Sequence, residues 1–216
     1  MLGGLERAFH DLQSNPQMFV IRFMLLVVAI TFHEFGHAVV AHSCGDPTPS
    51  QQGRVTLNPL AHLDPIGTIG MLLYTFGWGK PVMVSPGYFR GRWDHVKVAA
   101  AGPFMNLLQA IVFGIALRAA MQNHVDAGGP LYDILFYGMA VNVGLMAFNL
   151  IPIGPLDGAT ILKGFLPLRT AWEFEQFNRQ WGMLLMIVLL FSGYVGLFIA
   201  PVQNFFFSIF LGRGFA

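Results

Sequence analysis

The sequence predicts an all-α polytopic membrane protein with four full transmembrane helices, short re-entrant or interfacial helices and a small β-strand element. Hydrophobic residues make up 55% of the 216 residues and charged residues only 11%, well below the roughly 25% charged residues of soluble domains. The mean hydropathy is +0.58. Several stretches reach the ~20 apolar residues that a spanning helix requires. The gaps between them leave no room for an inserted soluble domain, so residues 1–216 are predicted to form a single membrane-embedded domain.

Four stretches are long and apolar enough to cross a bilayer. They run from Phe19 to Ser43, from Val96 to Met121, from Leu131 to roughly Ile153, and from Trp181 to Ala200. Residues 1–18 mix charged and apolar side chains and are predicted to form an interfacial segment. The shorter stretch Ile66–Trp78 predicts a re-entrant or interfacial helix, and Val202–Leu211 predicts an interfacial attachment. The predicted strands are Arg54–Leu57 and Val82–Ser85.

Charge and cysteine content exclude several classes of protein and indicate an orientation. The net charge is +1, which gives no reason to expect a nucleic-acid partner. Cys44 is the sole cysteine, so neither an intramolecular disulfide nor a four-thiolate metal site can form. Lysine and arginine gather in residues 80–97 and 157–179, whereas residues 122–130 contain none. The positive-inside rule therefore predicts that the first two segments are cytoplasmic and the third is external.

The sequence His33-Glu-Phe-Gly-His37 lies inside the first predicted span. Residues four apart share one face of a helix, so both imidazoles can bind one zinc ion while Glu34 reaches a water on that ion. An ionisable residue at the centre of a spanning helix costs at least ~2.5–3.5 kcal/mol, and a bound metal would offset this cost. The alternative is a structural polar cluster in which these side chains bond to neighbouring helices.

Asp157 is the candidate for a third metal ligand. It lies in the segment from Asn149 to Gly158, which begins in a predicted span and breaks at Pro152 and Pro155. Irregular backbone at membrane depth is tolerated where it is buried in protein or lines a water-filled cavity. The alternative is a capping aspartate just outside the membrane. Turn, cap, loop or interface roles are predicted for the remaining polar candidates, which are His10, His42, His62, Asp64, His95 and His124.

Three motifs in this order resemble those of the site-2 protease family of intramembrane zinc metalloproteases. The first is the sequence at residues 33–37, and the second is Ala101-Gly-Pro-Phe-Met-Asn106. The third is Asn149-Leu-Ile-Pro-Ile-Gly-Pro-Leu-Asp-Gly158, which keeps the asparagine, the first proline and the Leu-Asp-Gly of the family pattern. Together they cover residues 19–158. The stretch from Gly53 to Gly70 is similar to the compact bacterial branch, which lacks PDZ and nucleotide-sensing domains.

The resemblance implies a site and its chemistry. His33, His37 and Asp157 would bind one zinc ion per chain, and Glu34 would be the catalytic base. Asn149 would hold the substrate backbone or the oxyanion, and Asn106 would do likewise. Residues 19–158 would form the catalytic core and residues 159–216 the C-terminal helices. The substrate would be a transmembrane protein or peptide in the lipid bilayer of the bacterial inner membrane, with the active site nearer the cytoplasmic side.

The predicted function is hydrolysis of peptide bonds within or near the bilayer by metal-activated water. The substrate helix must unwind first, and the two predicted strands could pair with it by strand addition. One alternative is a non-proteolytic membrane protein that binds or transports zinc, which would not need Glu34. The other is an inactive scaffold relative, which would be expected to lack a ligand or the base. The sequence does not indicate an oligomeric state.

Overall fold

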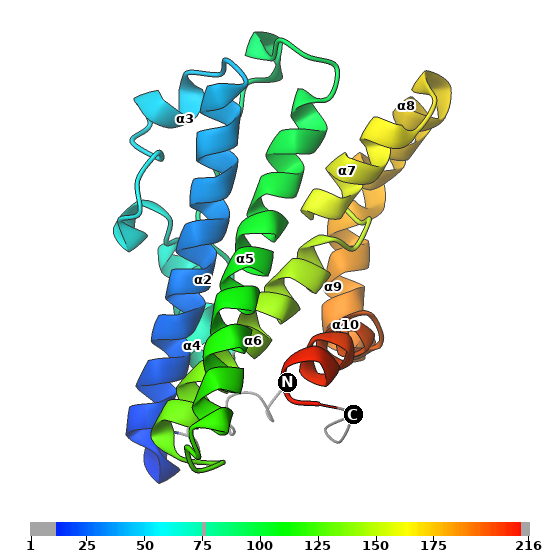
Figure 1. Ribbon diagram of the computed structural model, residues 1–216. Coiled ribbons are helices and arrows are strands. Elements are labelled where there is room, and N and C mark those ends of the chain that lie inside the picture. Colours follow the sequence, from blue (N-terminus) through cyan, green and yellow to red (C-terminus); the bar gives the residue numbers. More distant parts are fainter. Residues whose placement is uncertain (1–11, 75–76, 213–216) are drawn as a thin grey trace.

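The computed structural model describes residues 12–74 and 77–212, which fold into helices joined by irregular segments (Figure 1). The α-helices are α2 (Pro16–Ser43), α3 (Thr48–Gln51), α4 (Pro65–Tyr74), α5 (Asp94–Gln122), α6 (Pro130–Asn149), α7 (Asp157–Phe165), α8 (Leu168–Phe177), α9 (Met183–Ser192) and α10 (Val195–Phe210). Two 3₁₀ turns, η1 (Pro59–Ala61) and η2 (Pro86–Tyr88), and one π-helical turn, η3 (Asn178–Gly182), lie between them.

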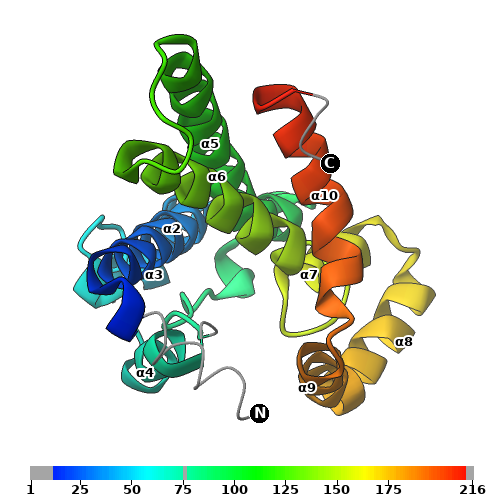
Figure 2. The same ribbon diagram turned by 90° about the horizontal axis from the view of Figure 1, so that it is seen from below.

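Three long helices form the centre of the fold. Helices α2, α5 and α6 run side by side, with α5 antiparallel to the other two (Figure 1). Between α5 and α6 the core contains fully buried apolar residues, among them Leu117, Met139 and Val143. Phe206 of α10 packs against the same core. The view from below shows α8 and α9 set apart from this bundle, with α10 leading back to it (Figure 2).

Helix α2 begins where its sequence provides an N-terminal cap. The Asn15 side chain accepts a hydrogen bond from the Met18 backbone N–H (3.1 Å), and Pro16 occupies the first helical position. Asparagine is among the best capping residues, and proline fits the first turn because the N–H it lacks would be unpaired there. The helix therefore starts three residues before the predicted Phe19. Residues 1–11 of the predicted interfacial segment lie outside the described residues.

Three of the predicted spans agree with helices that are long and apolar enough to cross a membrane. These are α2, α5 and α6. The predicted third span was too long, because α6 ends at Asn149 and not near Ile153. Beyond Asn149 the chain turns irregularly until Asp157, as expected from the prolines, which cannot donate a backbone hydrogen bond and clash with a preceding helical turn.

The predicted continuous fourth span from Trp181 to Ala200 is not found. The helical stretch 168–192 ends at Gly193, and α10 continues at an angle of 72°. Gly193 has φ +78°, a left-handed conformation that glycine adopts without steric penalty and that commonly ends helices. Hydropathy identified the apolar stretch, but the glycine divides it. A fourth crossing exists only if this bent pair counts as one span.

The predicted β-strand element is also absent from the described residues. Leu63 and Gly79 form a single isolated antiparallel bridge, and neither Arg54–Leu57 nor Val82–Ser85 pairs with another strand. Instead, side chains bind much of the backbone in these loops, as described below. The predicted re-entrant or interfacial helix corresponds to α4, whose start is capped by Asp64 through a 2.8 Å hydrogen bond from Gly67 N–H.

Candidate metal centre

Three side chains from two separate helices converge on one point. His33 and His37 come from α2, and Asp157 is the first residue of α7. The two Nε2 atoms are 3.1 Å apart, and Asp157 Oδ2 lies 3.3 Å from His33 Nε2 and 3.4 Å from His37 Nε2. Ligand atoms bound tetrahedrally at about 2.0–2.1 Å from a zinc ion lie about 3.3 Å from one another. The spacing therefore fits a shared metal ion.

The hydrogen bonds of the two histidines determine which ring nitrogens face this point. His33 Nδ1 donates to Asn106 Oδ1 (2.7 Å), and His37 Nδ1 donates to the carbonyl of Val98 (2.7 Å). Each Nε2 then carries a free lone pair. Asp157 Oδ2 is buried, and no hydrogen-bond donor among the described residues reaches it. Three electron-pair donors thus face one another, an arrangement that a bound cation would stabilise, and two histidines with a carboxylate are a common ligand set of catalytic zinc.

Asn106 connects His33 to the centre of the bundle. Its side chain is fully buried. Its Nδ2 donates to the carbonyl of Ala29 (3.1 Å) and to Asn142 Oδ1 (2.9 Å), which leaves Oδ1 as the acceptor for His33. Asn142 in turn donates to the carbonyl of Gly138. Such outer partners fix the tautomer and orientation of a ligating histidine. This geometry places Asn106 behind the metal ligand His33, and its contact with substrate stays a prediction.

Gly102 allows α5 to pack closely against the side chains of His33 and His37. A Cβ atom at this position would lie 2.3 Å from His37 Nε2 and 2.6 Å from His33 Nε2. Gly36 plays a similar role on α2, since a Cβ there would lie 2.8 Å from the carbonyl oxygen of Ala101. The space beside both ligand atoms is therefore kept open by the absence of a side chain.

Glu34 lies one residue from His33 and half-buried at the same end of α2. Its Oε2 accepts a hydrogen bond from the backbone N–H of Val82 (3.1 Å). The contact ties the carboxylate to the irregular segment that follows α4. A carboxylate beside a metal-bound water is the usual general base of zinc peptidases with this helical motif.

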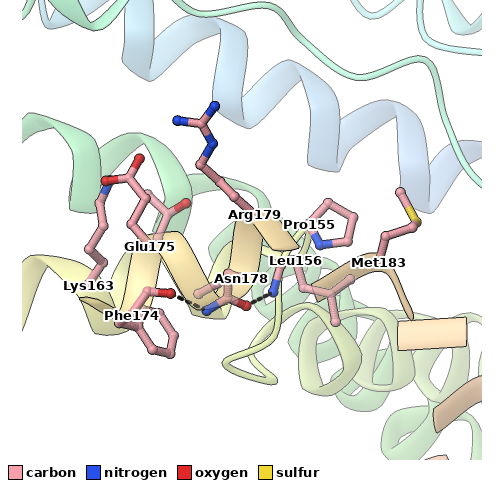
Figure 3. A pocket seen from close by; sticks show the side chains of 11 residues that line it. Pro155, Leu156, Lys163, Phe174, Glu175, Asn178, Arg179 and Met183 are labelled. Atoms are coloured by element: carbon pink, nitrogen blue, oxygen red, sulfur yellow. Dashed lines mark hydrogen bonds and ion pairs between the residues drawn. The ribbon is translucent and has the colours of Figure 1, made fainter. Parts of the chain in front are cut away.

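The turn before Asp157 is fixed from two sides. On one side, Gly158 at the start of α7 packs against the turn, and a Cβ there would lie 2.3 Å from the carbonyl oxygen of Leu150, so only glycine fits. On the other side, Asn178 Oδ1 accepts a 2.6 Å hydrogen bond from the Gly154 N–H and Nδ2 donates to the carbonyl of Phe174. Asn178 is one of the residues that line a pocket of about 360 Å³ (Figure 3). The pocket lies beside the segment that carries the third ligand.

Comparison with known proteins identifies the family. The model of peptidase family M50 matches residues 114–192. A Bacillus subtilis protein named "Putative zinc metalloprotease YwhC" is 34% identical over 190 residues, which cover 83% of this chain and 84% of that protein. The chain belongs to peptidase family M50, the site-2 protease family. The apolar helices and the family together make it an integral membrane protein, and its relatives support a zinc metalloprotease.

Two other relatives are also named as zinc metalloproteases. "Putative zinc metalloprotease Rip2" of Mycolicibacterium smegmatis is 29% identical over 193 residues, covering 82% of this chain and 71% of that protein. "Zinc metalloprotease MJ0392" of Methanocaldococcus jannaschii is 26% identical over 184 residues, covering 85% of this chain and 45% of that protein. No solved structure matches the chain.

Asn149, the other predicted substrate ligand of this M50 protein, is half-buried at the end of α6. Its Nδ2 donates to the carbonyl of Leu145 (3.0 Å) in its own helix. Its contact with substrate stays a prediction. Asn142 and Arg54 are buried polar residues that the sequence did not single out. Asn142 could have been found as an amide inside an apolar span, whereas nothing local to Arg54 indicates its burial.

Asn178→Ala is expected to weaken zinc binding by about 10-fold. This is the lower end of the 10–100-fold cost of removing a group bonded directly to a ligand, because Asn178 acts on Asp157 only through the turn. The substitution leaves the Gly154 N–H without its acceptor and loosens the turn that orients Asp157. Competition with a zinc chelator measures the change. Asn123→Ala is the control, because Asn123 also bonds to its own helix but lies exposed, far along the chain from the site. Equal affinities for wild type and Asn178→Ala would contradict the assignment.

Proposed function

We propose that this chain is a zinc-dependent endopeptidase that cuts membrane-anchored protein substrates within or near the bilayer. The single observation that carries the proposal is the convergence of three possible ligands beside Glu34. His33 and His37 lie on α2, which is apolar enough to span a membrane, and Asp157 reaches them from the start of α7. The donor set suits catalytic zinc, which keeps one coordination position open. Membership of peptidase family M50 supports the same reaction.

Each residue of the site has a distinct task in this reaction. Zinc, when bound, acts as a Lewis acid and lowers the pKa of a coordinated water to about 7. His33 and His37 present neutral Nε2 atoms because their Nδ1–H groups are bonded elsewhere. Glu34 accepts the proton of the attacking water and passes it to the leaving amine. Asn149 is proposed to hold the substrate backbone or the oxyanion.

The segment next to Glu34 offers a surface for an unwound substrate. Val82–Ser85 is irregular backbone, and the N–H and C=O groups of Met83 and Val84 have no hydrogen bond within the described part of the chain. An extended peptide could use these groups, because strand addition supplies main-chain hydrogen bonds.

The proposed location is the bacterial inner membrane. The site is proposed to lie nearer the cytoplasmic side, which rests on the lysines and arginines of residues 80–97 and 157–179.

Cleavage by the purified protein tests this function. The protein in detergent is stripped of metal with a chelator, reloaded with zinc, and incubated with a panel of single-span membrane proteins. The expected result is cleavage in or near the span, lost on chelation and restored by zinc. Zinc binding without cleavage of any substrate would reject the proposal. Zinc movement into liposomes without cleavage would favour a transporter, whereas the absence of both activities would favour a scaffold.

A further inference from the structure

The sequence motif from Gly53 to Pro65 contains a buried cation that the proposed mechanism does not use. Arg54 is only 3% exposed, and no carboxylate of the described residues lies within ion-pair distance of it. Its guanidinium donates instead to three backbone carbonyls, those of Ala61, Lys80 (2.8 Å) and Pro81 (2.7 Å). A guanidinium is a planar fork of donors that a lysine cannot reproduce. Arg54 therefore fastens one loop to another.

Residues 79–85 form a strap across α2, and several other groups fasten it. The Lys80 N–H donates to the carbonyl of His62 (2.7 Å), and the Ser85 N–H donates to Asp46 Oδ2 (2.6 Å). Both His62 and Asp46 are fully buried. At Gly79 the strap lies so close to α2 that a Cβ would be 2.8 Å from Ile30 Cγ2. The strap is thus held at both ends by buried groups.

Asp46 and Arg54 each keep the charge that their hydrogen bonds with the strap require. Burial alone would raise the pKa of Asp46, but the hydrogen bonds from Ser85 and Thr48 outweigh burial and hold that pKa below its ordinary value. Asp46 therefore remains an acceptor at neutral pH. Burial lowers the pKa of Arg54, and the nearby charge of Glu34 opposes this change. A guanidinium stays protonated in proteins, so Arg54 keeps all its donors.

Between its two ends, the strap forms a hydrogen bond with the Glu34 side chain. Two of the three carbonyls that Arg54 binds belong to Lys80 and Pro81 of the strap, and the Val82 N–H donates to Glu34 Oε2. The Pro81 carbonyl and the Val82 N–H belong to one planar peptide unit, so holding the carbonyl sets the direction of the N–H. The zinc ligands are oriented by different elements, since His33 is held by Asn106 and Asp157 lies on α7.

We propose that Arg54 is a positioning residue for peptide hydrolysis, which clamps residues 80–81 so that the Val82 N–H holds the Glu34 carboxylate in its working place. This inference rests on the proposed protease function and deepens it. It separates two tasks within one site: α5 orients the histidine ligands and α7 supplies Asp157, whereas the strap positions the base. Arg54 touches neither substrate nor metal and acts through Val82.

The test compares Arg54→Lys and Val82→Pro, singly and together, in the zinc-loaded full chain. The first keeps the charge but loses the fork, and the second removes the N–H itself. Each single variant is expected to lower kcat by about 10²-fold, the size of effect that a misplacement of about 1 Å produces, with KM and zinc content unchanged. The double variant should be no slower than Val82→Pro, because both changes break one connection. Arg169→Lys is the control, since Arg169 is 92% exposed.

Three outcomes would overturn the proposal. A raised KM with unchanged kcat would show that the strap binds substrate without orienting the base. Loss of zinc would show that Arg54 supports the metal site or the fold. Additive effects in the double variant would show that Arg54 acts by another route.

Amide hydrogen exchange separates this proposal from the protease function itself. Arg54→Lys is expected to speed exchange at Val82 and Ser85 and to leave exchange in α2 and α5 unchanged. This measurement needs no substrate. If the wild type cleaved nothing, the protease function would fail, and unchanged exchange at Val82 would separately refute the clamp.

Discussion

Glu34→Gln is expected to reduce peptide cleavage by about 10³-fold, within the 10²–10⁴-fold range of general acid–base catalysis. Glutamine has almost the same shape as glutamate, and its carbonyl oxygen can still accept the hydrogen bond from the Val82 N–H. It cannot take a proton from the attacking water at neutral pH. The three ligand atoms are untouched, so the variant should bind zinc as tightly as the wild type.

The measurement for Glu34→Gln is the initial rate of substrate cleavage together with the zinc content of the same preparation. Glu173→Gln is a matched control, because Glu173 is an exposed carboxylate that pairs with Arg169 on the surface of α8. It should cleave at the wild-type rate. Cleavage by Glu34→Gln at the wild-type rate would mean that another group accepts the proton. Loss of zinc from this variant would instead make Glu34 part of the metal site.

Gly102→Ala is expected to lower zinc affinity by at least about 100-fold, the upper range for changes next to a metal ligand, and to abolish cleavage. The added methyl group would lie 2.3 Å from His37 Nε2 and 2.6 Å from His33 Nε2. Neither ring can swing away easily, because each Nδ1 is already bonded to α5. Accommodation therefore requires α2 and α5 to move apart, and overpacking of this kind also destabilises a fold by about 1–3 kcal/mol.

Zinc titration and thermal unfolding measure the two effects of Gly102→Ala separately. Gly196→Ala makes the same substitution in α10, where a Cβ meets nothing within 4 Å. It should bind zinc and unfold like the wild type. A Gly102→Ala protein that kept wild-type zinc affinity would show that the histidines adopt another arrangement when metal is bound.

Features that depend on near neighbours in the sequence were predicted best. The pairing of His33 with His37 follows from helical spacing, and the start of α2 lies within three residues of the predicted Phe19 because Asn15 and Pro16 begin the helix earlier. The errors arose where a local pattern has more than one structural solution. The apolar run from Trp181 is divided at Gly193, and the predicted strand Val82–Ser85 has its backbone bound by side chains and not by another strand.

The sequence by itself determined the membrane class, the two histidines with Glu34 between them, and Asp157 as the candidate third ligand. Only the tertiary structure decided that Asp157 reaches the histidines, that Asn106 lies behind His33, and that Arg54 clamps the strap. The physical reason is the range of the interactions. Helical spacing is set by the backbone over four residues, whereas the partner of a buried polar group is set by packing between segments far apart in the chain.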